Sequence, residues 1–222
     1  METKRISLFM GHYGSGKSFS AVNYAYMLKA QNHNVSVYDL DIVNPYFRTV
    51  DAERELKERG INLVVSQFAE TNVDVPALNS ASYRMIADKS QYAVVDVGGD
   101  DRGALALGRF AEDIKKENNY DAFWVINCFR PETKTVEDAL VIKKEIEYAS
   151  KIPFTAIVNN SNLGQLTTAE DIIKGYKFCE EISKITGLKI KFTAVREDLI
   201  TKEIKENIGD VLSVKPIEYK IW

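Results

Sequence analysis

The chain has 222 residues, of which 45% are hydrophobic and 27% are charged, a composition that suits a sizeable core and excludes a disordered protein. Its 29 basic and 32 acidic side chains give a formal net charge of −3, which argues against a protein that coats nucleic acid by charge alone. We expect a cytoplasmic protein, because no apolar run is long enough to cross a bilayer and residues 1–10 do not resemble a signal peptide.

Short β-rich runs alternate along the chain with longer helical patterns. The expected strands cover 6–10, 35–40, 62–68, 92–97, 122–127, 154–159 and 190–195, and the expected helices cover 17–30, 51–59, 76–89, 104–118, 133–150, 168–186 and 198–206. Most of these strands are apolar nearly throughout, which is typical of a parallel sheet covered on both faces. We therefore predict a single α/β domain over 1–222, built on a doubly wound, mostly parallel sheet of about seven strands with helices on both faces.

The segment after the first strand, GHYGSGKS at 11–18, matches the phosphate-binding pattern G-x-x-x-x-G-K-[ST] between a strand and a helix. Lys17 is expected to reach the β- and γ-phosphates and to serve catalysis, and the Ser18 hydroxyl to bind Mg²⁺. Backbone amides and the start of the following helix are expected to surround the phosphate oxygens. The phosphate-binding set is Gly11, His12, Tyr13, Gly14, Ser15, Gly16, Lys17 and Ser18.

Acidic motifs follow the second and fourth expected strands. Asp39 and Asp41 lie at the carboxyl edge of the second strand, where an aspartate orients an attacking water or binds Mg²⁺. Asp96 ends the run YAVVD, which is the Walker B pattern and predicts a second Mg²⁺ contact. Gly99 is expected to offer its backbone N–H to the γ-phosphate, and such a loop is an order–disorder switch in many nucleotidases. Residues 100–102 are either switch residues or solvated charges.

With these three motifs in this order, residues 5–206 resemble the MinD/ParA branch of P-loop ATPases. The resemblance implies a homodimeric switch that binds ATP and Mg²⁺, hydrolyses ATP and acts on a client protein. It also implies that Asp41 positions the attacking water. The segments VNNSNL and VREDLITKEI are similar to the family's base-binding loops, although Arg196 stands where the family has proline. The base contacts that this implies come from Asn159, Asn160, Val195, Arg196 and Glu197.

The segment that begins at Asn159 also bears on the choice of base. Guanine-specific relatives carry N-K-x-D, whose aspartate accepts two hydrogen bonds from guanine. Aligned on Asn159, this chain reads N-N-S-N, so Asn160 replaces the lysine and Asn162 replaces the aspartate. An asparagine lacks the two carboxylate acceptors that guanine requires, and it suits the amino donor and ring acceptors of adenine better. The sequence therefore favours ATP over GTP.

The phosphate loop departs from the family at its second residue. The family reads K-G-G-x-G-K-[ST], and its first lysine neutralises phosphate charge across the dimer, whereas this chain has His12 and Tyr13. Either His12 replaces that lysine, with a charge that responds to pH near neutrality, or the contact across the dimer is lost and His12 packs against the loop. Both interpretations stay open at the level of sequence.

Partners are the least specified part of the function. Residues 211–222 lack the basic amphipathic period of a membrane-targeting helix, and Cys128, Cys179, His12 and His33 form no paired metal-ligand motif. We find no strong sequence sign of membrane or nucleic-acid binding. Three alternatives to a switch remain: a small-molecule kinase or ligase of the dethiobiotin-synthetase-like type, an accessory GTPase for metallocofactor maturation, and a nucleotide-binding module without hydrolysis.

Overall fold

The computed structural model describes residues 3–40, 49–65, 80–99 and 101–215, which form an α/β fold around one parallel sheet. The sheet has eight strands in the order β3-β2-β4-β1-β5-β6-β7-β8. The strands are β1 (Ile6–Met10), β2 (Val35–Leu40), β3 (Asn62–Val65), β4 (Tyr92–Val97), β5 (Tyr120–Ile126), β6 (Ala156–Asn159), β7 (Lys189–Arg196) and β8 (Val211–Val214). The parallel, doubly wound prediction is confirmed, with one strand more than the expected seven.

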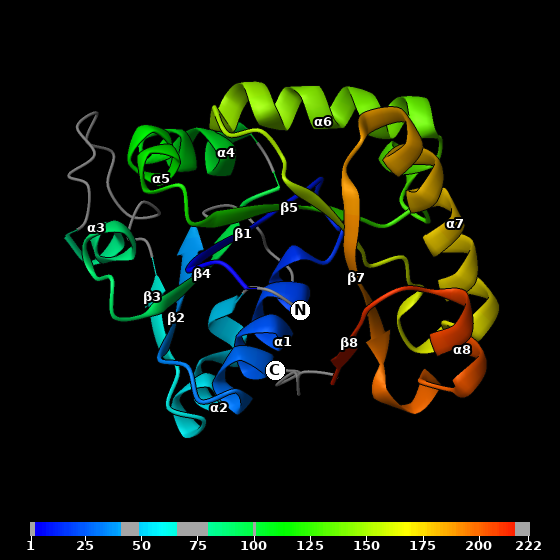
Figure 1. Ribbon diagram of the computed structural model, residues 1–222, viewed down its shortest axis with the longest axis horizontal. Coiled ribbons are helices and arrows are strands. Elements are labelled where there is room, and N and C mark those ends of the chain that lie inside the picture. Colours follow the sequence, from blue (N-terminus) through cyan, green and yellow to red (C-terminus); the bar gives the residue numbers. More distant parts are fainter. Residues whose placement is uncertain (1–2, 41–48, 66–79, 100, 216–222) are drawn as a thin grey trace.

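Helices cover both faces of this sheet (Figure 1). They are α1 (Lys17–Ala30), α2 (Glu53–Glu58), α3 (Ser80–Ala87), α4 (Asp101–Gly108), α5 (Ala111–Glu117), α6 (Val136–Ser150), α7 (Ala169–Thr186) and α8 (Lys202–Asn207). Helices α4, α5 and α6 lie on one face, and α1 and α2 lie on the other (Figure 1). Because helices cover both faces of the sheet, its strands have to be apolar nearly throughout. None of the helices in the described ranges is long and apolar enough to cross a membrane.

An aromatic cluster fixes α1 against the sheet. Tyr24 of α1 packs against Phe9, Phe123 and Phe192, which come from β1, β5 and β7, with ring centroids 5.4, 5.6 and 5.7 Å away. All four side chains are fully buried, and burial raises the pKa of Tyr24 to about 12. Because α1 follows the phosphate loop directly, this cluster also sets the position of that loop relative to the strand ends.

Helix ends account for most differences from the expected boundaries. The segment expected as one helix over 104–118 is two helices, and a Cβ at Gly108 would lie 3.0 Å from Ala149 O, so α4 ends where it approaches the end of α6 closely. Helix α6 begins after Thr135, whose side chain accepts a hydrogen bond from Asp138 N. The helix expected over 168–186 is confirmed as α7, which begins after the cap residue Thr168 and ends before Gly187 in the left-handed conformation. Residues 66–68 and 76–79 of two expected elements lie outside the described residues.

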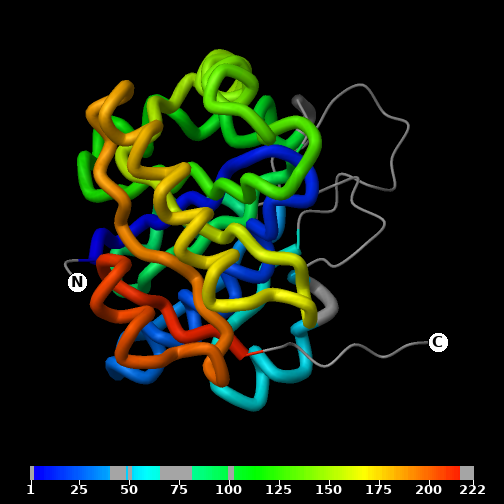
Figure 2. The backbone as a smooth tube through the Cα atoms, turned by 90° about the vertical axis from the view of Figure 1, so that its right-hand side faces the viewer, coloured from blue at the N-terminus to red at the C-terminus, as the bar shows by residue number. Residues whose placement is uncertain are grey.

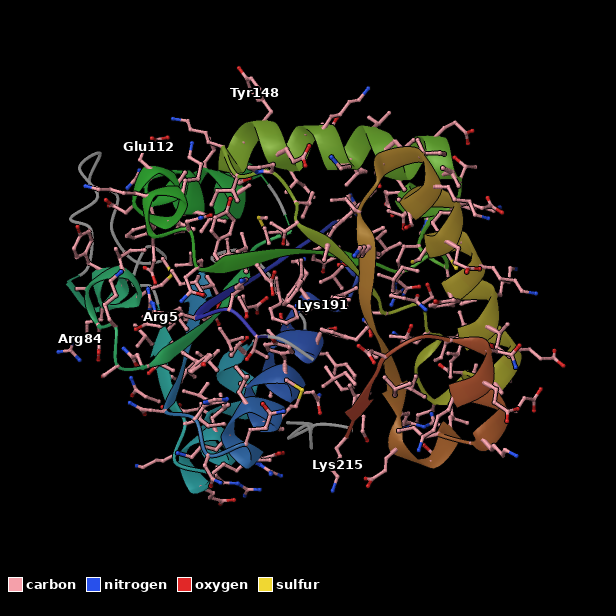
Figure 3. The ribbon with its side chains drawn as sticks, viewed as in Figure 1. Arg5, Arg84, Glu112, Tyr148, Lys191 and Lys215 are labelled. Carbon is pink, nitrogen blue, oxygen red and sulfur yellow. The ribbon has the colours of Figure 1, made fainter. Side chains whose placement is uncertain are left out.

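A buried arginine joins the first strand to the far end of α5. Arg5 is 7% exposed and lies within the fold, whereas Arg84, Glu112 and Tyr148 project from its periphery (Figure 3). It donates to Met85 O at 3.0 Å and to Asp88 O at 3.1 Å, and its Nη2 lies 2.6 Å from Glu117 Oε2. Burial opposes the charge of Glu117, but the hydrogen bonds from Arg5 and Lys89 outweigh it and lower the pKa of this carboxyl.

Candidate nucleotide site

The phosphate loop, residues 11–16, joins β1 to α1 at the carboxyl edge of the sheet. Gly14 and Gly16 have φ values of 75° and 83°, in the left-handed region that favours glycine. Gly16 is the residue directly before α1, so the unpaired amides at the start of this helix face the loop. Ser15 N donates to His12 O at 3.1 Å and closes the turn. The loop therefore has the glycine conformations and helix start that a phosphate cradle requires.

Neighbouring strand ends hold the loop closely from outside. A Cβ at Gly11 would lie 2.4 Å from Val125 O, and a Cβ at Gly16 would lie 2.1 Å from Asn160 Nδ2. The Asn160 side chain donates to Ser15 O at 2.7 Å, and Asn160 is buried. Asn160, predicted to bind the base, is thus placed by the structure on the outer side of the phosphate loop.

Lys17 and Gly99 bring two of the predicted motifs together. Lys17 is 5% exposed, and its Nζ donates to His12 O at 3.2 Å, inside the loop. A Cβ at Gly99 would lie 2.7 Å from Lys17 Nζ and 2.8 Å from Tyr13 N, so Gly99 leaves no room for a side chain there. A buried ammonium in a glycine-containing loop that leads into a helix start fits the triphosphate of a nucleotide.

Two buried carboxylates lie side by side at the same edge. Asp39 and Asp96 are directly paired in register between β2 and β4, and they are 2% and 0% exposed. Val37 and Val94, two residues earlier on each strand, pack in the same core cluster as α1. Because side chains alternate along a strand, both carboxylates point to the face that carries α1. They therefore lie on the side of the sheet where Lys17 and Ser18 begin that helix.

The oxygen ligands at this edge suit Mg²⁺. Ser18 is buried in the first turn of α1, and hydroxyl and carboxylate oxygens are the ligands of hard cations. In the described ranges there is no group of three or more histidine, cysteine, aspartate or glutamate side chains that would hold a metal alone. Mg²⁺ in nucleotide sites commonly has one or two protein carboxylates, with phosphates and waters completing the shell. Asp41, the predicted water-positioning residue and third Mg²⁺ contact, lies outside the described residues.

The loop after β6 is fixed by its own asparagines. Asn159 is fully buried, its Oδ1 accepts from Ser161 N at 3.1 Å, and its Nδ2 has no hydrogen-bond partner among the described residues. Asn162 donates from Nδ2 to Asn160 O at 2.7 Å and accepts at Oδ1 from Gly164 N at 3.1 Å. Both polar atoms of Asn162 are therefore engaged by the local backbone.

The segment after β7 meets this loop through Arg196. Arg196 donates to Gly164 O at 3.2 Å and pairs with Asp198 at 2.9 Å, and its hydrogen bonds lower the pKa of that carboxyl. Val195 is fully buried in the core cluster of α7 and α8, whereas Glu197 is exposed. The structure thus joins the two segments predicted to bind the base, and the base contacts of the five residues stay a prediction.

Two residues near the site escaped the sequence analysis. Thr49 is fully buried and donates from Oγ1 to Asp96 Oδ2 at 2.7 Å. Arg130, on the segment after β5, donates from Nε to Gly14 O at 2.8 Å, and Figure 2 shows this segment beside the phosphate loop. Residues 127–134 follow the carboxyl end of a strand, and this position could have predicted that Arg130 lies near the site. No sequence pattern around Thr49 predicts its contact with Asp96.

His12 lies at the same junction. Its Nδ1 is 3.0 Å from Tyr13 O and 3.9 Å from a carboxylate oxygen of Glu132, which belongs to the segment after β5. The histidine side chain therefore packs on the outer side of the loop, while Tyr13 beside it is 41% exposed. These contacts agree with a packing role and leave a role across a dimer untested.

Solved structures with the same fold include a cell division protein and a signal recognition particle protein. Cell division protein FtsY from Thermotoga maritima has a TM-score of 0.57 at 21% identity, covering 87% of this chain and 62% of that chain. The signal recognition particle 54 kDa protein from Aeropyrum pernix, in complex with GDP, has a TM-score of 0.57 at 18% identity, covering 86% and 41%. This chain therefore spans less than two thirds of their length, and the likeness shows the fold alone.

The sequence itself assigns the family. No curated protein matches this chain. Residues 7–168, more than half of the chain, match the CobQ/CobB/MinD/ParA nucleotide binding domain. The matched range includes the phosphate loop, Asp39, Asp96, Gly99 and the asparagine-rich loop after β6. The chain belongs to the CobQ/CobB/MinD/ParA family of nucleotide-binding domains.

Proposed function

We propose that the protein is a Mg²⁺-dependent switch of MinD/ParA type that binds and hydrolyses ATP and acts on a protein partner in the cytoplasm. The observation that carries this proposal is the meeting of Lys17, Gly99 and the Asp39–Asp96 pair at one edge of the sheet. Backbone amides of the loop and Lys17 would hold the phosphates, and Ser18 and Asp96 would hold Mg²⁺. When bound there, the ion would neutralise charge on the phosphate oxygens. In this proposal Asp41 orients the attacking water.

The contact of Gly99 with the phosphate loop supports a switch. The γ-phosphate would accept a hydrogen bond from Gly99 N, so its loss on hydrolysis would release the segment after β4. That change would be transmitted to a homodimer face beside Tyr13, which is exposed on the same loop. Binding of a client protein would then depend on the bound nucleotide.

The state of Asn162 supports adenine as the base. In a guanine site the side chain at this position accepts from the base, but Asn162 already binds Asn160 O and Gly164 N. An amide also offers one acceptor oxygen where a carboxylate offers two. To accept hydrogen bonds from guanine, Asn162 would have to break these local hydrogen bonds. We therefore propose ATP in preference to GTP.

Replacement of the loop lysine tests the proposal. We expect Lys17→Ala to lower ATP turnover by about a hundredfold or more, the usual effect of removing one such charge-stabilising group. Lys144→Ala, an exposed lysine of α6, is the matched control and should leave turnover unchanged. Turnover and ATP affinity are measured with Mg²⁺ present and with Mg²⁺ chelated. Unchanged affinity and turnover in Lys17→Ala would refute the proposal.

The same assay separates the alternatives. A switch hydrolyses ATP slowly alone, a small-molecule kinase or ligase requires an organic acceptor, and an accessory GTPase binds and hydrolyses GTP in preference to ATP. Competition of ATP binding by GTP and turnover with and without candidate acceptors decide among them. Tight GTP binding with weak ATP binding would contradict the choice of adenine.

A further inference from the structure

A groove lies beside the phosphate loop and has no part in the function proposed above. One wall is the segment between β5 and α6, and the other wall is α7. Its volume of about 930 Å³ lies within the range of about 300 to 1,000 Å³ that small-molecule sites occupy. The same side of the molecule carries the phosphate loop (Figure 2).

One face of α7 supplies the second wall. The lining positions on this helix are 170, 173, 174, 177, 178 and 181, the spacing of a single helical stripe. Ile173 and Phe178 are half-buried and form the apolar part of this stripe. Phe129 adds an apolar side chain to the opposite wall. Lys174 Nζ lies 5.5 Å from the Phe129 ring centroid, so the two walls meet through a cation–π contact.

The charges of the groove are unbalanced toward the positive. Four cationic side chains line it, Arg130, Lys134, Lys174 and Lys177, against the two carboxylates Glu170 and Glu181. The carboxylates occupy the two ends of the α7 stripe, while Lys174 and Lys177 occupy its middle. In the part of the chain that the structure describes, Lys134, Lys174 and Lys177 form no ion pair. The centre of the groove therefore presents positive charge over an apolar surface.

The wall that carries Arg130 is held rigidly. Asn127 organises it: its backbone O accepts from Thr133 Oγ1 at 2.6 Å and from Arg130 N at 3.2 Å. Asn127 Nδ2 also donates to Asn162 O at 3.1 Å, which ties the wall to the loop after β6. A preformed wall lowers the ordering cost of binding a ligand.

We propose that this groove binds a small organic anion with an apolar or aromatic body, as a second ligand beside the nucleotide. The apolar body would lie on Phe129, Ile173 and Phe178, and the anionic group would face Lys174 and Lys177. Arg130 lines the groove and donates to Gly14 O, so it connects this ligand to the phosphate loop. The proposal goes beyond the nucleotide switch and does not depend on which nucleotide the loop binds.

The test uses 1-anilinonaphthalene-8-sulfonate, an aromatic sulfonate, and its uncharged analogue N-phenyl-1-naphthylamine on the full chain. We expect saturable fluorescence with the sulfonate and, in the double variant Lys174→Glu/Lys177→Glu, about tenfold weaker binding, because two attractive charges become repulsive. The control Lys144→Glu/Lys184→Glu makes the same charge change at exposed lysines outside the groove and should bind normally. The uncharged analogue should be insensitive to both double variants.

Three results of the dye titrations would overturn the proposal. These are sulfonate binding that the groove variant leaves unchanged, equal weakening in the control variant, and equal weakening of the uncharged analogue. A glutamate-rich peptide that binds the groove while the sulfonate does not would also overturn it, in favour of an acidic protein segment. ATP binding is measured on the same variants: it reports correct folding, and its presence or absence decides the nucleotide proposal separately.

Discussion

Asn160 leaves no room for a side chain at Gly16 of the phosphate loop. A Cβ at position 16 would lie 2.1 Å from the amide nitrogen of Asn160, which donates a hydrogen bond to Ser15 O. Gly16 has a φ of 83°, so a larger residue is strained there even without Asn160. The two residues thus depend on each other. Because residue 16 is glycine, there is room for the Asn160 side chain, whose amide holds the loop through Ser15 O.

This dependence predicts non-additive effects. We expect Asn160→Ala to lower the free energy of unfolding by about 1 kcal/mol, because Ser15 O loses its hydrogen bond. Gly16→Ala should lower it by about 2 kcal/mol or more through the steric contact and the backbone strain. In the double variant the methyl group introduced at position 16 no longer meets the amide, so the total loss should be smaller than the sum of the single losses. Urea denaturation of the four proteins measures this, and strict additivity would contradict the contact.

Helix α7 carries its own start signal, independent of the nucleotide site. Thr168 accepts from Asp171 N at 3.3 Å, and the Asp171 side chain accepts in return from Thr168 N at 2.9 Å. This capping box satisfies two amides that would otherwise lack partners at the first turn. The helix that forms one wall of the groove is therefore set in place by local hydrogen bonds.

Loss of this cap should affect stability and not nucleotide affinity. We expect Thr168→Ala to lower the free energy of unfolding by about 1 kcal/mol. Thr168→Ser keeps the hydroxyl and should retain most of the stability, which makes it the control. Urea unfolding and ATP titration are run on both. Equal losses in the two variants would show that the methyl group, and not the capping oxygen, is what matters.

Elements with strong local signals were predictable, and contacts between distant elements were not. The apolar runs at β1, β2 and β4 predicted their bounds as found, and the helix expected over 168–186 closely matches α7. The strand β8 was missed because it has only four residues, too few for a clear pattern, and lies at a sheet edge next to a proline-containing segment. The contacts Thr49–Asp96 and Arg130–Gly14 join residues 47 and 116 positions apart, and no local pattern encodes such a meeting.

At the scale of the whole molecule, Arg5 joins β1, the turn before β4, and α5. Its ion pair with Glu117 is 7% and 11% exposed, whereas Lys89 on the same carboxylate is 57% exposed and contributes less. The pKa of Glu117 is lower in the folded chain than in the unfolded chain. The ion pair therefore stabilises the fold fully above the unfolded pKa, and this stabilisation is lost as pH falls through the folded pKa.

The acid dependence of stability follows from this linkage. We expect Glu117→Gln to lower the free energy of unfolding by about 1 to 2 kcal/mol at pH 7, since a charged hydrogen-bonded pair is broken. The difference from the native chain should shrink as pH falls through the folded pKa of Glu117, where the native carboxyl is also neutral. Urea unfolding between neutral and acidic pH measures this difference. A difference that is constant with pH would show that the ion pair is not its source.

The order of strands in the sheet differs from the order in which the chain is made. β2 and β3 are neighbours and can pair as soon as Val65 is present, but β1 pairs only with β4 and β5, which begin at Tyr92 and Tyr120. In a growing chain, β1 is made before both of its partners and has no strand partner until about residue 97 has left the ribosome. The phosphate loop therefore precedes in the sequence the strands that hold it, and takes its shape only after β4 has been synthesised.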